Sequence, residues 1–430
     1  RIALAISIFM ILAWITEVME YSAAGMFGLT LFWLFHVAKP AVIFGGFIND
    51  ASWFYLGAML VGAMASKSGL PQRIANFVVT RVGVTYSRLL LGLIIIDFLL
   101  TFIVPSGAAC VVIMASIALG IVKLFDVEKG SNIGKGMFLV ITYTTSIFNK
   151  MIVAGTASIV ARALIQHDGN VDVSWGLWFA AFLPCAIGTI LASWWLTLKL
   201  FPPEAQTLEG QEALKLHFGT KELWTPSALK AAALSALALA LWMTDWLHHI
   251  PAPIVALGVG LIALMPFVNV LDESDFRKIN LLPFFFVGAA LGMGEVLKAT
   301  GGLDILTNVL MGGLGPLLTG KVTSILLLYW SGFLYHFVTA SEVSMLATSM
   351  PVLMEFAKTH HMDPRWVGMI WSFASGGKLF AYQSAVLVLG YSYGFFTPKD
   401  LLKVGGILTL VEFVLLFASV LLYWPFLGIS

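Results

Sequence analysis

Two lysines stand alone in long uncharged stretches of the sequence. Lys378 is the one Asp, Glu, Lys or Arg between Arg365 and Lys399, and Lys150 occupies a similar stretch. The surrounding residues are apolar, small or hydroxyl-bearing, as in a membrane span. An ionised lysine at the centre of a bilayer costs at least about 2.5–3.5 kcal/mol, so it normally faces a cavity and has a partner. A pair of such ammonium groups would suit an anion.

The segments around the two lysines match each other. TSIFNKMIVAGTASIV, from Thr145, aligns without a gap on FASGGKLFAYQSAVLV, which places Lys150 on Lys378 and Thr156 on Ser384. Small and polar residues after each lysine predict a helix that breaks inside the membrane. Matching broken helices in two halves of a chain are typical of secondary transporters, whose substrate site lies where the repeats meet. The alternatives are that each lysine extends to an interface or pairs with a structural carboxylate.

Polar residues near the two breaks and at two candidate hairpin tips could orient the oxygens of a bound anion. Hydroxyl and amide donors converge in small-molecule pockets, although Ser and Thr also pack helices together in membranes. The N-terminal ends of half-helices would add partial positive charge. The predicted substrate site consists of both lysines together with Ser106, Gly107, Asn149, Gly155, Thr156, Ser158, Ser341, Glu342, Ser344, Gln383 and Ser384.

Two lone acidic residues are candidates for a role beside the lysines. Glu342, in TASEVSM, could pair with a lysine in the empty site, act as a proton carrier, or be a surface carboxylate at a hairpin entrance. Asp97, in LIIIDFLLTF, could belong to the site or hold a neighbouring helix.

Composition places these residues in a polytopic membrane protein. The 430 residues are 59% hydrophobic and only 11% charged, whereas soluble domains carry roughly 25% charged residues. Apolar runs recur along the whole chain, and each approaches the roughly 20 residues that span a bilayer. The net charge of +1 argues against a nucleic-acid partner. Cys110 and Cys185 lie in apolar segments as packing residues, and no spacing indicates a metal or other cofactor.

A polar segment at 201–225, with two prolines and four glutamates, is a linker between two halves. Each half contains apolar runs, then a segment that starts with polar or helix-breaking residues, then an interrupted span and a final span. We expect the segments 104–125 and 339–360 to be hairpins that enter the membrane and turn back. The predicted fold is all-α, with two inverted repeats.

With these features, the chain resembles the divalent anion/sodium symporter family, within the ion-transporter superfamily of elevator-type carriers. The resemblance covers nearly the whole chain and includes GGFINDASWFYLGAMLVGAMASKSGLPQRIANFVV and DFRKINLLPFFFVGAALGMGEVLKATGGL. It implies scaffold spans at 1–103 and 226–338 and a moving transport domain at 104–200 and 339–430. It also implies a homodimer and a substrate such as a C4 dicarboxylate, a tricarboxylate or sulfate.

The site motifs depart from the family pattern of two Ser-Asn-Thr tips and two Thr-Pro-Pro-Asn-like breaks. The tips read Pro105-Ser106-Gly107 and Ser341-Glu342-Val343, and the breaks read GTAS and YQSA, so the asparagines and the prolines of the breaks are missing. A lysine precedes each break instead. We expect Lys150 and Lys378 to replace two sodium ions, which predicts sodium-independent exchange of a dianion.

Three other function classes are compatible with parts of the pattern. One is a sodium- or proton-coupled symporter of dicarboxylate, tricarboxylate or sulfate. A cation/proton antiporter using Asp97 and Glu342 fits paired lysines poorly, and a channel fits broken spans poorly. An enzyme is not expected, because no nucleophile–base pair or metal cluster lies in the spans. Compact loops and the absence of a targeting signal indicate a bacterial inner membrane.

Overall fold

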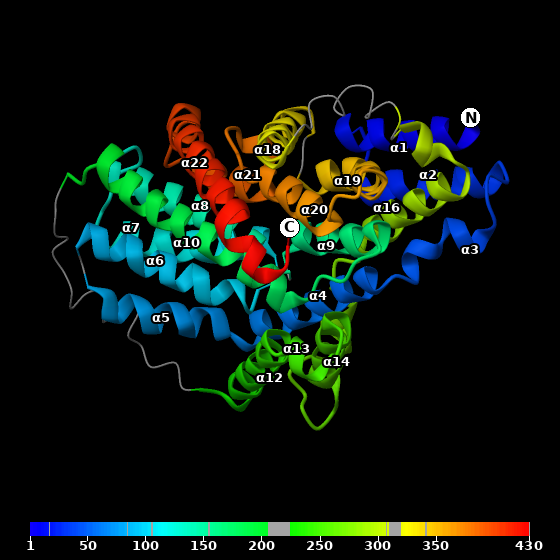
Figure 1. Cartoon of the computed structure of the whole chain (residues 1–430). Helices are drawn as coiled ribbons and strands as arrows, with labels where there is room; N and C mark the ends of the chain where they lie inside the picture. Colours follow the sequence, from blue (N-terminus) through cyan, green and yellow to red (C-terminus); the bar gives the residue numbers. More distant parts are fainter. Residues whose placement is uncertain are drawn as a thin grey trace.

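The structure is a computed structural model in which all regular structure of the described residues is helical, with no strand (Figure 1). The described residues are 1–16, 18–83, 85–104, 106–153, 155–204, 224–306, 308, 320–339 and 342–429, without the side chains at 51 and 156. Most of the linker at 201–225 and the residues Pro105 and Ser341 lie outside this description.

Several helices are long and apolar enough to cross a membrane. Five meet both criteria within the described residues: α7 (Gly107–Leu124), α10 (Trp175–Leu200), α12 (Pro226–Met243), α16 (Leu282–Ala299) and α22 (Pro398–Ala418) with its continuation to Leu427. These spans confirm an all-α, polytopic integral membrane protein.

The first half of the chain starts with helices that pack against helices from the second half. Its early elements are α1 (Ile2–Thr16), α2 (Tyr21–Leu34), α3 (Pro40–Ile43), η1 (Gly45–Phe47), α4 (Asp50–Ser68), α5 (Leu70–Val82) and α6 (Tyr86–Thr101). Among these, α1 and α2 contact α16, and α4 contacts α14 (Ala252–Leu264). In Figure 1, α12, α13 (Asp245–His248) and α14 lie together at one end of the molecule.

Both long apolar stretches that carry the lysines are broken helices. In the first, α8 (Asn132–Met151) ends one residue after Lys150, and α9 (Thr156–Gly169) follows, with Ile152 and Gly155 in extended conformation between the two helices. In the second, α20 (Pro364–Ala374) ends before Lys378, and η3 (Ala381–Gln383) leads into α21 (Ala385–Ser392). The predicted interruptions are therefore present.

The two hairpins are larger than the sequence pattern indicated. The segments 104–125 and 339–360 do not turn back on themselves, because each forms one continuous helix, α7 or α19 (Glu342–Thr359). Each helix is instead the second arm of a helix–turn–helix whose first arm is α6 or α18 (Lys321–Val338). Polar residues of these segments lie at the starts of the helices, since Ser106 caps α7 by accepting from Ala109 N and Glu342 is the first residue of α19.

Helices of each half of the chain pack against the broken helix of the other half. Helix α21 packs against α7 and α8, α19 packs against α9, and α20 packs against α9 as well. Helix α22 packs against α10 and α20. This packing brings the ends of the half-helices and of the hairpin arms close to one another.

Candidate functional site

The ammonium groups of Lys150 and Lys378 converge on one carboxylate, that of Glu342. Lys150 Nζ lies 3.1 Å from Glu342 Oε1, and Lys378 Nζ lies 3.0 Å from Oε2. Both lysine side chains are buried, and Glu342 is 14% exposed. Glu342 is the first residue of α19, at the second hairpin tip, so this ion-pair triad joins both breaks to that hairpin.

Two serines complete the contacts of the charged groups. Ser375 Oγ lies 3.0 Å from Lys150 Nζ and donates to Glu342 Oε1 at 2.8 Å. Lys378 Nζ donates to Ser146 Oγ at 2.6 Å. Ser146 lies one helical turn before Lys150 on α8, and Ser375 directly follows the end of α20. Both serines lie in the aligned segments, but neither was among the predicted site residues.

A cavity of about 180 Å³ borders this triad, and the N-terminal ends of four helices meet at it. Helix N-termini carry partial positive charge and unpaired N–H groups, so a place where four of them meet attracts an anion. The lining residues come from the starts of α7, α9, α19 and α21 and from the end of α8: Ser106, Gly107, Ala108, Asn149, Lys150, Ala157, Glu342, Val343, Ser384, Ala385 and Val386.

The first hairpin tip approaches the breaks closely at Gly107. A methyl group at this position would lie 2.6 Å from Asn149 Nδ2 and 2.8 Å from Val386 Cγ2, nearer than atoms pack. Only a residue without a side chain lets the start of α7 touch both α8 and α21. Asn149 donates from Nδ2 to Thr145 O, which fixes its amide at the cavity wall.

Other predicted residues shape the breaks and do not touch the lysine ammonium groups. Ser158 donates to the carbonyl of Asn149 at 3.0 Å, and Gly155 caps the start of α9. Gln383 Oε1 accepts from the backbone N–H of Leu379 and Phe380 at 2.7 and 2.9 Å, which holds the loop after Lys378.

The remaining predicted residues have mixed positions. Ser384 caps α21 and lines the cavity, while Ser344 is buried on α19 and is not among the lining residues. Thr156 starts α9, but its side chain lies outside the description, as does the whole of Ser341.

Asp97 lies in a separate polar cluster. Its carboxylate accepts from Thr144 Oγ1 at 2.7 Å, Thr145 Oγ1 at 2.9 Å and Cys110 Sγ at 3.2 Å. These contacts tie α6 to α8 and α7, and none involves a lysine. Asp97 therefore holds helices together, as one of the two interpretations proposed.

Glu412 is a buried carboxylate near the site that the sequence reasoning missed. It lies on α22 with 3% exposure, in the apolar run LTLVEFVLLF. A lone acid in an apolar run is the same signal that drew attention to Asp97, so the pattern could have identified it. Within the described residues, no group of three His, Cys, Asp or Glu side chains is placed to hold a metal ion.

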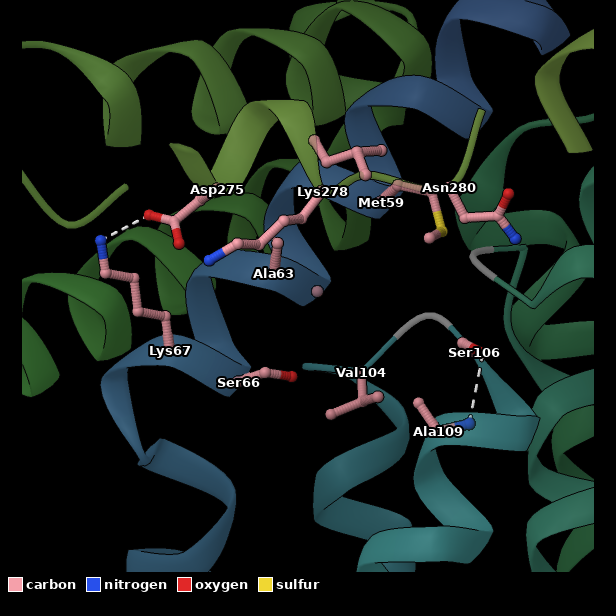
Figure 2. A pocket seen from close by; sticks show the side chains of 12 residues that line it. Met59, Ala63, Ser66, Lys67, Val104, Ser106, Ala109, Asp275, Lys278 and Asn280 are labelled. Atoms are coloured by element: carbon pink, nitrogen blue, oxygen red, sulfur yellow. Dashed lines mark hydrogen bonds and ion pairs between the residues drawn. The ribbon is translucent and has the colours of Figure 1, made fainter. Parts of the chain in front are cut away.

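A second cavity of about 410 Å³ adjoins the first, since Ser106 lines both. Figure 2 shows it between α4, the start of α7 and the segment around α15 (Glu273–Arg277), with Lys67 and Lys278 among its lining side chains. Lys67 Nζ lies 2.7 Å from Asp272 and also pairs with Asp275. The hydrogen bond from this ammonium holds the pKa of the exposed Asp272 carboxyl well below its usual range.

Comparisons with known proteins identify relatives along the whole chain. The family model "Sodium:sulfate symporter transmembrane region" matches residues 1–430. A protein of Cupriavidus necator named only as a membrane protein is 25% identical over 456 residues, 99% of this chain and 87% of the relative. The citrate/succinate antiporter of Escherichia coli K12 is 26% identical over 92% of this chain and 82% of its own. The L-tartrate/succinate antiporter of the same strain is 23% identical over 88% and 80%, respectively.

Proposed function

The chain belongs to the sodium:sulfate symporter family, and we propose that it exchanges small divalent carboxylates, such as C4 dicarboxylates, across a membrane. The family membership confirms the resemblance found in the sequence and the expectation of a transporter. The names of two relatives, which specify succinate in exchange for citrate or tartrate, support the substrate class and the exchange mode.

The observation that carries the proposal is the position of the Glu342 carboxylate. It lies between two buried ammonium groups, at the cavity where four helix N-termini meet. Such surroundings stabilise a carboxylate through charge-assisted hydrogen bonds and helix dipoles. A substrate carboxylate would be stabilised there for the same reason, once Glu342 moves away with its hairpin tip.

The two fixed cations support a sodium-independent mode of action. In this proposal each ammonium supplies the positive charge that a sodium ion would bring, and it cannot leave with the substrate. Two lysines match the two charges of a dicarboxylate. Release of one dianion then leaves the site ready for another, which favours exchange over net uptake.

The larger cavity next to the site is proposed as the entry route for the substrate. It reaches Ser106 from the side of α4 and α15, and Lys278 offers positive charge along it (Figure 2). We further propose that the transport-domain segments 104–200 and 339–430 move against the other spans, and that α6 and α18, which the resemblance assigns to the scaffold, move with them as the first arms of the two hairpins. The carrier would act as a homodimer, as the resemblance implies, and in a bacterial inner membrane, as the compact loops indicate.

Counterflow in liposomes tests the proposed function. Liposomes that contain the purified protein and unlabelled succinate are supplied with labelled succinate outside, with sodium present or replaced by choline. We expect equal uptake in both media. Lys150→Ala and Lys378→Ala should each abolish it, whereas Lys358→Ala should not, because Lys358 pairs with Glu355 at the far end of α19.

Sodium-coupled symport is the second candidate, because the matching family model is described by a sodium symporter. Uptake that collapses in choline, or that needs no internal succinate, would favour this second function. Full activity of both lysine variants would refute the proposed role of the triad.

A further inference from the structure

Glu412 borders the ion-pair triad without belonging to it. A methyl group added at Gly376, in the loop before Lys378, would lie 2.7 Å from Lys150 Nζ and 2.8 Å from Glu412 Oε2. Both groups therefore lie close to the backbone of Gly376. Glu412 Oε2 is buried and has no hydrogen-bond partner among the described residues. A buried carboxylate oxygen without a partner is costly when charged, which indicates a role other than holding the fold.

The described titratable groups that interact electrostatically with Glu412 come from several elements of the fold. The charged ones are Lys150 on α8, Lys378 in the loop after α20, and Glu342 on α19. The others are neutral: Tyr143 on α8, Cys185 on α10 and Tyr329 on α18. Among the described residues, the cations that balance the charge of Glu412 are therefore the two lysines, which it shares with Glu342.

The charge of the site changes when a dicarboxylate replaces Glu342. In the empty site, two lysines and Glu342 leave one positive charge, which an ionised Glu412 neutralises. A dianion that displaces Glu342 neutralises both lysines by itself. An ionised Glu412 would then be an unpaired buried charge, and such a charge is strongly unfavourable.

Glu342 and Glu412 differ in how they can respond. Glu342 is partly exposed, lies at a hairpin tip and lines the cavity, so it can leave the lysines by moving. Glu412 lies inside α22, where Thr409 contacts the loop at Gly377 and Gly405 contacts the backbone of Lys378. It has no such path, so it must change its charge.

We propose that Glu412 is a proton-binding site of the transport cycle, which takes up one proton each time a dicarboxylate replaces Glu342 between Lys150 and Lys378. The inference rests on the proposed anion site. The proton comes from the solvent and returns to it when the substrate leaves. A carrier with this property binds a dianion together with a proton and moves no unbalanced charge in its core.

Linked protonation has a measurable consequence for binding. Where the empty site has Glu412 ionised, uptake of one proton weakens succinate binding by up to about tenfold for each unit of pH rise. Succinate itself stays mainly a dianion from about pH 7 to 8.5, because its second carboxyl group, although raised in pKa by the first carboxylate, titrates below this range. Glu412→Gln, which resembles the protonated acid, should bind succinate with a Kd that does not change over this range.

Isothermal titration calorimetry with succinate tests the inference on the full purified chain. Titrations at one pH in buffers of different ionisation enthalpy give the number of protons taken up per succinate bound. We expect about one for the wild type and none for Glu412→Gln. Asp97→Asn is the matched control, because Asp97 is equally buried but has three donors and no lysine contact, and it should keep the proton uptake.

The outcomes separate this inference from the proposed function. Succinate binding without proton uptake by the wild type overturns the role of Glu412 and leaves the proposed function intact. Proton uptake that persists in Glu412→Gln also overturns it, because another group then takes the proton. An absence of succinate binding by the wild type removes the proposed function and the inference together. If Glu412→Gln does not fold, Glu412→Asp, which keeps an acid, should retain both the proton uptake and the pH dependence, and loss of either would count against the inference.

Discussion

Replacing Glu342 by glutamine should strengthen succinate binding, although Glu342 contacts the most important side chains of the site. In the empty protein its carboxylate occupies the position between Lys150 and Lys378, so a substrate must displace it. Glutamine has nearly the same shape, and the two lone pairs of its amide oxygen can still accept hydrogen bonds, but it carries no charge. The variant therefore tests whether Glu342 competes with the substrate or helps to bind it.

The size of the effect follows from the two ion-pair contacts of Glu342. A hydrogen bond to a charged group contributes about 1.5–3 kcal/mol, whereas a neutral one contributes about 0.5–1.5 kcal/mol. Loss of the charge weakens each contact by about 1 kcal/mol on this basis. Two contacts give about 2 kcal/mol, which corresponds to a Kd for succinate about 30-fold lower. Without succinate the variant should also be less stable by the same amount, about 2 kcal/mol, because the two buried ammonium groups lose a charged partner and keep a neutral one.

Calorimetric titration and thermal unfolding of the purified protein measure both effects. We expect Glu342→Gln to have a lower Tm without succinate and a larger rise in Tm with saturating succinate than the wild type. Glu355→Gln on the same helix is the control, because Glu355 pairs with Lys358 and not with the site. A folded Glu342→Gln variant that binds succinate more weakly than the wild type would refute the reasoning, since Glu342 would then be a substrate ligand and not a competitor.

Three further predictions concern single side chains. Gly107→Ala should lower succinate exchange about tenfold, because the added methyl overpacks the site by about 1–3 kcal/mol and pushes the first hairpin tip away from Asn149. Gly258→Ala is the control and should leave exchange unchanged, because its added methyl meets nothing within 4 Å. Asp97→Ala should lower the free energy of unfolding by about 2–4 kcal/mol in denaturant titrations without changing the Kd for succinate, and a changed Kd would place Asp97 in the site. Lys278→Gln should slow initial succinate uptake about two- to threefold at low salt, with the difference disappearing at high salt, and a salt-independent loss would argue against electrostatic attraction along the larger cavity.

The broken helices could be predicted because two local signals coincided. An ammonium without a nearby charge marks a buried polar position, and the gapless match between the segments at Lys150 and Lys378 indicated that both belong to one structural device. The structure brings these lysines together at Glu342. Residues that line the cavity, such as Ser106 and Ser384, were found because they lie at helix starts, which polar residues favour for reasons of capping.

The full extent of the hairpins and the place of Glu412 beside the site were missed for different physical reasons. Polar residues at 104–107 mark a turn, but they do not show which flanking helix forms the other arm, because that depends on packing between α6 and α7. Glu412 lies 34 residues after Lys378 on an unbroken helix. Only the tertiary structure shows that α22 passes close to Gly376, in the loop before Lys378. Sequence spacing identifies neighbours on one helix, whereas contacts between helices depend on the tertiary structure.

The two kinds of departure from the family motifs, the added lysines and the glutamate at the second hairpin tip, are related by charge balance. A lysine that replaces a sodium ion stays in the membrane after the substrate leaves, so an empty site with two such lysines needs a carboxylate from the protein. The second hairpin tip reads Ser341-Glu342-Val343, with an acid at the position where the family pattern has asparagine. The lysines alone would leave buried unpaired charge in the empty carrier, and the acid alone would repel an anionic substrate. If the lysines replace sodium as proposed, the exchange of sodium for lysine requires the exchange of asparagine for glutamate, because each change offsets the charge that the other leaves.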